Sequence, residues 1–296
     1  MPFAGFTCEI IAEPVTPVEC LACARSGPLP GCPMSAPVIK GILDGLRPDD
    51  FGLTVTTLLG CARKFRMKQD FEYVCRPREL WWAYRGQLLH GVAASYAAGD
   101  PHAIAERRFT MVLEADGRFV EISGQPDLIY TDRRMVIDFK TTKSVPGPWR
   151  TYTCPESETV IRKGPFAWRN KYLPCPHCPE GQHVAREIVH EGPPRPYRTH
   201  VQQVSAYRLL LAENDVPIER AVVIYQDMAQ QLPIEVDLLP VAETLAMLQE
   251  RLALFTAPDL PPVLTDAEEV WECSYCAVQG ACERLHGSPV GRESVS

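Results

Sequence analysis

Val136-Ile137-Asp138-Phe139-Lys140 is the stretch that decides the fold, because an apolar run ends there in an acid, an aromatic residue and a base. Residues i and i+2 of a β-strand share a face, so we expect Asp138 and Lys140 to project into one site while Phe139 packs behind them. This pair suits phosphodiester hydrolysis, in which a carboxylate holds a divalent cation and an ammonium steadies the attacking water or the phosphate charge. A structural salt bridge at the end of a buried strand is the alternative.

The segments around this stretch predict an antiparallel meander. Four segments have the composition of strands: residues 107–115, 118–123, 127–130 and 135–140. Asp116-Gly117 between the first two is a hairpin signal. Gly124-Gln125-Pro126-Asp127 begins one strand and Asp138 ends its neighbour, so the two carboxylates are expected to meet at one end of the sheet. Two such acids repel unless a cation lies between them, which predicts a bound Mg²⁺ or Mn²⁺ ion.

The composition is that of a globular protein with a substantial core. The 296 residues are 46% hydrophobic and 23% charged, and no apolar run approaches the length of a membrane span. The opening residues 1–5 carry no basic region followed by an apolar stretch, so we expect no secretion signal, no membrane association and a cytoplasmic location.

The net charge of -7 argues against broad adhesion to nucleic acid but permits a local basic groove. Three segments combine basic residues with aromatic residues or prolines: residues 63–68, 162–172 and 195–198. Such segments can hold phosphates and stack on unpaired bases, or they can form a solvated face with extended side chains.

Twelve cysteines are many for a chain in a reducing compartment, where metal ligation is more common than disulfide bonding. Three pairs are separated by two residues, which lets two thiolates reach one metal from a tight turn: Cys20 and Cys23, Cys175 and Cys178, and Cys273 and Cys276. None of these pairs lies at the strand-to-helix junction of a thioredoxin-like oxidoreductase, which argues against that class.

Helical periodicity recurs outside the meander. Helices are predicted at about residues 54–65, 77–98, 200–213 and 241–255, and further strands at 220–225 and 232–236. Thr54 is the expected cap of the first helix, which carries Cys61. His90 lies in the middle of the second, where a lone histidine is more often a core residue than a ligand. Gln203 and Tyr207 are spaced i, i+4 and are expected to point into one groove.

The distribution of prolines and cysteines suggests four parts. Residues 1–47 are expected to form an irregular Pro/Cys-rich extension, residues 48–145 and 200–286 the core, residues 146–199 a Pro/Cys-rich insertion without secondary structure of its own, and residues 287–296 a flexible tail.

Zinc has three candidate ligand sets in the extension and the insertion. Cys20, Cys23 and Cys32 could fold the extension, and Cys154, Cys175 and Cys178 with His177 or His183 could form a knuckle. Alternatively, one site joins the two segments through Cys20, Cys23, Cys175 and Cys178. The spacing leaves these alternatives open.

Taken together, these features resemble the RecB-like branch of the PD-(D/E)XK nuclease superfamily, and most closely its CRISPR-associated iron-sulfur exonucleases and the nuclease domain of AddB. The resemblance covers roughly residues 51–285 apart from the insertion. It rests on the order of the motifs: Cys61, a helix with His90, Gly124-x-x-Asp127, Asp138-Phe139-Lys140, Gln203-x-x-x-Tyr207, and Cys273-x2-Cys276-x5-Cys282. It implies an α/β fold with a restriction-endonuclease-like core, in which helices flank a mixed, mostly antiparallel sheet.

The resemblance also implies roles for individual residues. The ligands of a catalytic Mg²⁺ or Mn²⁺ ion would be His90, Asp127, Asp138 and the main-chain carbonyl of Phe139. Lys140 would be the catalytic cation, and Gln203 and Tyr207 would position the scissile phosphate or the DNA strand. Glu106 opens the first strand and is a lesser candidate for the same site.

The C-terminal cysteines resemble the ligands of an iron-sulfur staple. By this resemblance, Cys61, Cys273, Cys276 and Cys282 would hold a [4Fe-4S] cluster that joins the C-terminal segment to the start of the core. Thiolates also bind zinc, so the type of ligand alone leaves the metal open.

The implied function is metal-dependent hydrolysis of DNA, most plausibly as an exonuclease on single strands or ends. The alternative is a catalytically silent or partner-dependent DNA-binding component of a helicase-nuclease or CRISPR adaptation complex. This chain departs from the family pattern in its residues before Phe51 and in the long separation of Lys140 from Gln203, and these additions are candidate sites for a protein partner.

Overall fold

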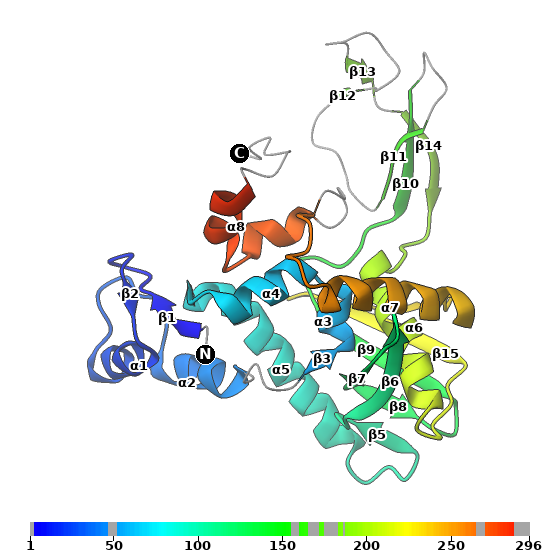
Figure 1. The fold of residues 1–296 in the computed structure, drawn as a ribbon, viewed down its shortest axis with the longest axis horizontal. Coiled ribbons are helices and arrows are strands. Elements are labelled where there is room, and N and C mark those ends of the chain that lie inside the picture. The colour runs from blue at the N-terminus through cyan, green and yellow to red at the C-terminus, as the bar shows by residue number, and fades with distance from the viewer. Residues whose placement is uncertain are drawn as a thin grey trace.

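The computed structural model describes residues 3–46, 52–154, 160–164, 172–174, 183–185, 187–264 and 270–286. These residues form an α/β fold of mixed sheets and helices, as the sequence predicted (Figure 1).

A five-stranded sheet in the order β16-β15-β9-β8-β5 positions the predicted site. Its strands are β5 (Ala103–Ala105), β8 (Leu128–Tyr130), β9 (Met135–Thr141), β15 (Arg220–Gln226) and β16 (Gln231–Glu235). All neighbours are antiparallel except β9 and β15, which run parallel with Asp138 opposite Val223. Parallel strands need a long connection, and residues between β9 and β15 supply it, including the insertion and a helix. The sheet is therefore mixed and mostly antiparallel, as predicted.

A second sheet in the order β3-β7-β6 contains the predicted hairpin, so the prediction of one continuous meander is wrong: its first two strands and its last two belong to different sheets. Its strands are β3 (Leu53–Thr54), β6 (Phe109–Ala115) and β7 (Arg118–Gly124). Asp116 and Gly117 have φ values of 52° and 72°, as the first and second turn residues of a type I′ hairpin require. Buried and exposed residues alternate strictly along β6, so one face packs inward.

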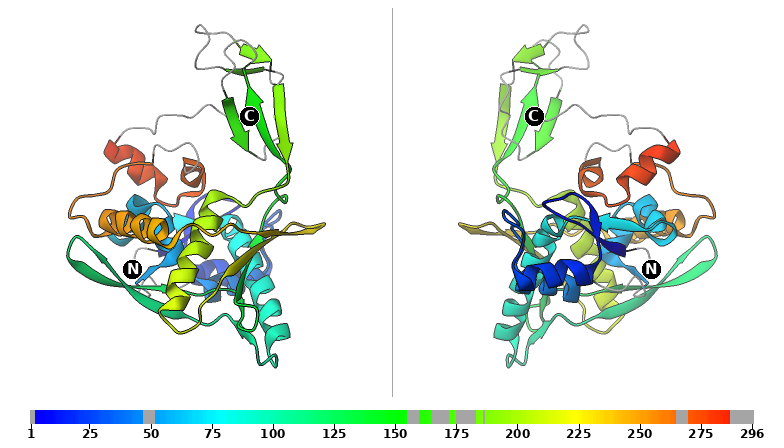
Figure 2. Two further views of the ribbon diagram at one scale, coloured as in Figure 1. Left: turned by 90° about the vertical axis from the view of Figure 1, so that its right-hand side faces the viewer. Right: turned by 90° about the vertical axis from the view of Figure 1, so that its left-hand side faces the viewer.

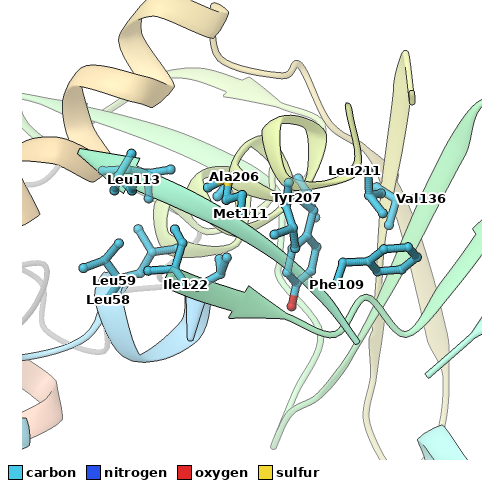
Figure 3. Close-up of a cluster of buried hydrophobic side chains, with 14 of the residues drawn as sticks. Leu58, Leu59, Phe109, Met111, Leu113, Ile122, Val136, Ala206, Tyr207 and Leu211 are labelled. Carbon is cyan, nitrogen blue, oxygen red and sulfur yellow. The ribbon is translucent and has the colours of Figure 1, made fainter. Parts of the chain in front are cut away.

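The main core lies between this hairpin and helix α6 (Arg198–Ala212), with α3 (Val55–Leu59) beside them. Figure 3 shows Met111 and Ile122 of the hairpin facing Leu58 of α3 and Ala206 and Tyr207 of α6. Because α6 is covered on nearly all sides, even its polar residues Gln202, Gln203 and Ser205 are buried.

The remaining helices surround these sheets. They are α4 (Ala62–Asp70), α5 (Pro77–Ala97), α7 (Val241–Thr256), the 3₁₀ helix η2 (Val270–Tyr275) and α8 (Gln279–His286). Thr54 caps α3 as expected, since its hydroxyl accepts a hydrogen bond from Thr57 N at 3.0 Å. The prediction of one helix over residues 54–65 is wrong, because the chain forms two helices there. Gly60 terminates α3, and Cys61 is the N-cap of α4.

Residues 3–46 form a small folded module, so the expectation of an irregular extension is wrong. It contains β1 (Phe3–Thr7), β2 (Pro14–Val15), α1 (Pro17–Ser26) and α2 (Ala36–Gly45). Its prolines begin helices instead of breaking them: Pro17 and Pro37 stand in the first turns of α1 and α2, where no backbone N–H is needed. Thr16 and Glu19 add a capping box to α1.

The insertion also has secondary structure, contrary to expectation. Its described residues include β10 (Trp149–Thr153), β11 (Val160–Gly164), β12 (Tyr172–Pro174), β13 (His183–Ala185) and β14 (Glu187–Gly192). The strands β11-β10-β14 form an antiparallel sheet, and β12 pairs with β13. Figures 1 and 2 show this arm projecting away from the remainder of the molecule.

Gly124, the first residue of the predicted Gly-x-x-Asp motif, permits close packing of β7 against α6. A Cβ atom at this position would lie 2.5 Å from Leu210 Cδ2 and 3.0 Å from Tyr207 Cε1. We expect Gly124→Ala to lower the free energy of unfolding by about 1–3 kcal/mol, because overpacking must displace the buried tyrosine or leucine. Urea unfolding measures this loss. Gly91→Ala on α5, where a Cβ meets nothing within 4 Å, is the matched control.

Candidate active site and cysteine cluster

Three side chains from different elements converge on one point. His90 of α5, Glu106 after β5 and Asp127 before β8 place one ligand atom each within 4.8 Å of the others. His90 Nδ1 lies 3.4 Å from both Glu106 Oε1 and Asp127 Oδ1. One nitrogen and two carboxylate oxygens at this spacing fit a divalent cation such as Mg²⁺ or Mn²⁺.

The backbone of β9 orients two of these ligands. Phe139 N donates to Asp127 Oδ2 at 2.6 Å, and His90 Nε2 lies 3.3 Å from Phe139 O. With Nε2–H donating to the carbonyl, the lone pair of Nδ1 faces the two carboxylates. That arrangement is repulsive without a proton or a metal ion between the groups.

Glu106 belongs to this group more fully than the sequence indicated. Gln125 Nε2 donates to Glu106 Oε2 at 2.5 Å, and Arg108 in turn holds Gln125 Oε1 at 3.0 Å. The other oxygen, Glu106 Oε1, accepts no hydrogen bond from the described residues. Glu106 also has a φ of 51°, an unfavourable backbone conformation for a residue with a Cβ. No sequence pattern predicts that turn.

Asp138 and Lys140 share one end of β9, as predicted. Asp138, predicted as a ligand of the same ion, lies outside the group of described ligand atoms within 4.8 Å of one another, in which Glu106 joins His90 and Asp127. Asp138 is 1% exposed, and Lys140 Nζ lies 2.7 Å from its Oδ2. That contact lacks hydrogen-bond geometry, and no other described group donates to Oδ2. Asp138 Oδ2 is therefore held by an ion pair with Lys140, and a metal ion at this oxygen would share it with that ammonium.

Gln203 connects the two charged residues of β9. Lys140 Nζ donates to Gln203 Oε1 at 2.9 Å, and Gln203 Nε2 donates to Asp138 Oδ1 at 3.2 Å and to Tyr207 Oη at 2.8 Å. Tyr207 is 3% exposed and lies beneath the glutamine. Its hydroxyl therefore holds the amide of Gln203 in place, which differs from the DNA-contacting role expected from the resemblance.

The electrostatics of the site favour a bound cation. Burial, and then the charge of Asp138, raise the pKa of Asp127 to about 8, although Lys140 and the Phe139 N–H act in the opposite direction. The carboxylates thus cannot all ionise near neutral pH unless another positive charge joins them. The donor set and the unused carboxylate oxygens both fit a divalent metal ion.

Next to the site, His200 is held as a neutral imidazole. His200 Nδ1 lies 2.7 Å from Tyr225 Oη, which also accepts a hydrogen bond from Tyr197 N at 2.9 Å. Burial and the charge of Lys140 lower the pKa of His200 to about 3.

This depressed pKa predicts a pH dependence of stability. Below about pH 6.5 the unfolded chain binds a proton at His200 that the folded chain excludes, so stability falls as the pH drops from about 6.5 towards 3. The variant His200→Gln keeps a polar partner for Tyr225. We expect its free energy of unfolding to fall less steeply than that of the wild type as the pH drops, by up to about 1 kcal/mol per pH unit. Urea unfolding at pH 7.5 and at pH 5.0, in EDTA, measures the loss of stability in both proteins. Equal losses in both proteins would contradict the prediction.

The four predicted cluster cysteines also converge. Cys61, Cys273, Cys276 and Cys282 line one pocket between α4 and the C-terminal helices. Burial raises the pKa of Cys61, Cys273 and Cys276, and charge on neighbouring thiols raises it further. Among the described side chains, no three thiols lie within 4.8 Å of one another.

The basic segment at residues 63–68 supports this pocket. Arg63, 2% exposed, donates from Nε to Cys282 Sγ at 3.2 Å and from Nη1 to Pro261 O at 2.6 Å. Arg66 donates to Ala257 O at 2.7 Å. These arginines anchor the chain that leads to the C-terminal cysteines, so they do not form a phosphate-binding face.

The zinc alternatives are partly outside the described residues. Cys175, Cys178 and His177 lie there, and the side chain of His183 is not described either. Cys20 and Cys23 lie on α1 in the N-terminal module.

Comparison with known proteins supports the fold alone. No family model matches the chain, and no curated protein matches it. The solved crystal structure of SSO0001 is similar with a TM-score of 0.50 and 18% sequence identity, covering 83% of this chain and 93% of that one. Within the described residues, no helix is both long and apolar enough to cross a membrane.

Proposed function

We propose that the chain is a divalent-metal-dependent deoxyribonuclease with a PD-(D/E)XK core. The observation that carries this proposal is the convergence of His90, Glu106 and Asp127 beside the Asp138 and Lys140 pair at the end of β9. The histidine and the three carboxylates would hold a Mg²⁺ or Mn²⁺ ion. Such an ion activates water as a Lewis acid and neutralises phosphate charge.

The chain's own residues would perform the remaining steps. His90, Glu106 and Asp127 offer ligand atoms from three elements, and Asp138 adds a carboxylate oxygen from β9. Lys140 is 22% exposed and can reach a non-bridging phosphate oxygen or the attacking water. Gln203 fixes the direction of that ammonium, since its carbonyl oxygen accepts from Nζ.

We propose DNA as the substrate, with single strands or ends preferred. A divalent ion held by these carboxylates, with Lys140 beside it, would offer positive charge to the phosphodiester of a polyanion. Trp149 of β10 lies beside Arg195, which follows β14, with the guanidinium 5.5 Å from the indole ring, a pair suited to unpaired bases and phosphate.

The C-terminal pocket would hold a [4Fe-4S] cluster through Cys61, Cys273, Cys276 and Cys282. The buried Arg63 N–H at Cys282 Sγ supports this group, because such hydrogen bonds stabilise ligated thiolates. The cluster would hold η2 and α8 against α4 and would take no part in hydrolysis.

Digestion of end-labelled single- and double-stranded DNA tests the function. Protein purified anaerobically is expected to cut with Mg²⁺ or Mn²⁺ and to stop when EDTA is added. Asp138→Asn removes a carboxylate oxygen from the site and is expected to lower the rate by at least about 100-fold. Asp132→Asn, in the exposed turn between β8 and β9, is the matched control and should cut normally.

The labelled products also reveal the polarity of digestion. A wild-type protein that binds DNA but remains as inert as Asp138→Asn would instead support the silent or partner-dependent component. Cleavage that survives EDTA would overturn the metal-dependent proposal.

A further inference from the structure

The N-terminal module brings together four cysteines from three separate segments. Cys8 follows β1 in a tight loop, where its N–H donates to Glu13 O at 2.8 Å and its carbonyl accepts from Ala12 N at 3.1 Å. Cys20 and Cys23 are spaced i, i+3 on α1 and so share a face of that helix. Cys32 lies in a turn in which its N–H donates to Leu29 O at 2.9 Å.

Packing draws these segments toward one another. A Cβ at Gly31 would lie 3.8 Å from Ile10 Cδ1, so the turn before Cys32 rests on the loop after Cys8. Cys20 and Cys32 both pack against a hydrophobic cluster that the module shares with the strand β4 (Tyr73–Cys75): Phe6, Met34, Ile39, Ile42 and Cys75. All four thiols are partly buried and none is in a disulfide.

The thiols of this group also interact electrostatically. Burial, and then the charges of Cys32, Cys8 and Cys23, raise the pKa of Cys20 to about 11, with Glu9 adding to the effect. Cys8, Cys23 and Cys32 are therefore close enough to Cys20 to act on it electrostatically.

We propose that Cys8, Cys20, Cys23 and Cys32 bind a second metal centre, distinct from the C-terminal cysteine cluster. Four thiolates suit Zn²⁺ and an iron-sulfur cluster alike, so the shared chemistry is a thiophilic centre with four sulfur ligands. This assignment supplies the N-terminal site with ligands from its own module, without Cys175 and Cys178.

The size of the module gives the metal a structural purpose. A module of about 40 residues buries too little surface to be stable alone, and chains of that size commonly need a metal or disulfides. The module also docks on α5: the side chain of Glu9 is buried, with Oε1 accepting from Arg78 N at 2.9 Å and Oε2 lying 3.5 Å from Arg78 Nε. A centre beside Glu9 would therefore fix the module to the helix that carries His90.

Metal analysis of the full chain tests this proposal. Iron, zinc and acid-labile sulfide per chain are measured after anaerobic purification for the wild type and three double variants. Cys20→Ser/Cys23→Ser is expected to lose one whole centre, either one zinc or the iron and sulfide of one cluster. Cys273→Ser/Cys276→Ser is expected to lose a different centre, and Cys175→Ser/Cys178→Ser to match the wild type.

A second measurement covers the case in which a variant misfolds. Wild-type protein is alkylated with iodoacetamide before and after metal removal, and the modified cysteines are located by mass spectrometry. Cys8, Cys20, Cys23 and Cys32 are expected to become reactive together only after metal removal.

Two results would overturn the proposal: unchanged metal content in Cys20→Ser/Cys23→Ser, or loss of its metal in Cys175→Ser/Cys178→Ser. Neither measurement uses DNA, so failure of this site and failure of the nuclease proposal are distinguishable.

Discussion

Replacing Lys140 by alanine is expected to lower the rate of DNA hydrolysis by about 100- to 1,000-fold while leaving metal binding in place. Loss of one preorganised donor to a developing phosphate charge has an effect of this size. Lys140 is the cation that the described structure places against Asp138 and Gln203, and it is partly open to solvent. Single-turnover digestion with saturating Mn²⁺ measures the chemical step.

The control for Lys140 lies just after the same strand. Lys143 is exposed three residues later, so Lys143→Ala removes an equal charge from the neighbourhood without touching Asp138. We expect it to change the rate less than about threefold, because exposed charges act weakly through solvent. Equal losses in the two variants would assign Lys140 to general attraction of DNA and would remove it from the chemical step.

Local patterns in the sequence predicted most of what positions this site. Three features are determined by neighbours along the chain. They are the alternation of buried and exposed side chains at residues 109–115, the Asp116-Gly117 turn, and the i, i+4 spacing of Gln203 and Tyr207. Asp127 and Asp138 meet because adjacent antiparallel strands fix their register, with Leu128 opposite Ile137.

The features that the sequence did not reveal depend on contacts between distant residues. The parallel pairing of β15 with β9 forms across the whole insertion, and no local signal specifies it. The recruitment of Glu106 rests on a left-handed backbone and on hydrogen bonds from Gln125. The prolines of the N-terminal module led to the prediction of an irregular chain. A proline is compatible with the first turn of a helix, but whether it stands there depends on the cap residue before it.

Replacing Asp127 by asparagine is expected to raise the stability of the metal-free protein and to abolish its stabilisation by Mn²⁺. Asp127 is 7% exposed and lies near two other carboxylates, so its ionisation in the folded chain is unfavourable. Asparagine has nearly the same shape, keeps an acceptor for Phe139 N and carries no charge.

The sign follows from the raised pKa of Asp127. The folded-state pKa of about 8 exceeds the ordinary value, so the wild type loses stability as the pH rises towards 8 in the absence of metal. In EDTA we expect Asp127→Asn to be more stable than the wild type by at least about 1 kcal/mol at pH 8, and by less at pH 5. Urea unfolding at the two pH values measures both differences.

Addition of Mn²⁺ should reverse this order. A ligand that binds only the folded state adds about 2.7 kcal/mol at a hundred times its dissociation constant, and only the wild type retains the complete set of ligands. Asp132→Asn, outside the site, should behave as the wild type in both conditions. If Mn²⁺ stabilised Asp127→Asn as strongly as the wild type, the ion would be bound elsewhere, and His90, Glu106 and Asp127 would be an acidic cluster held together by shared protons.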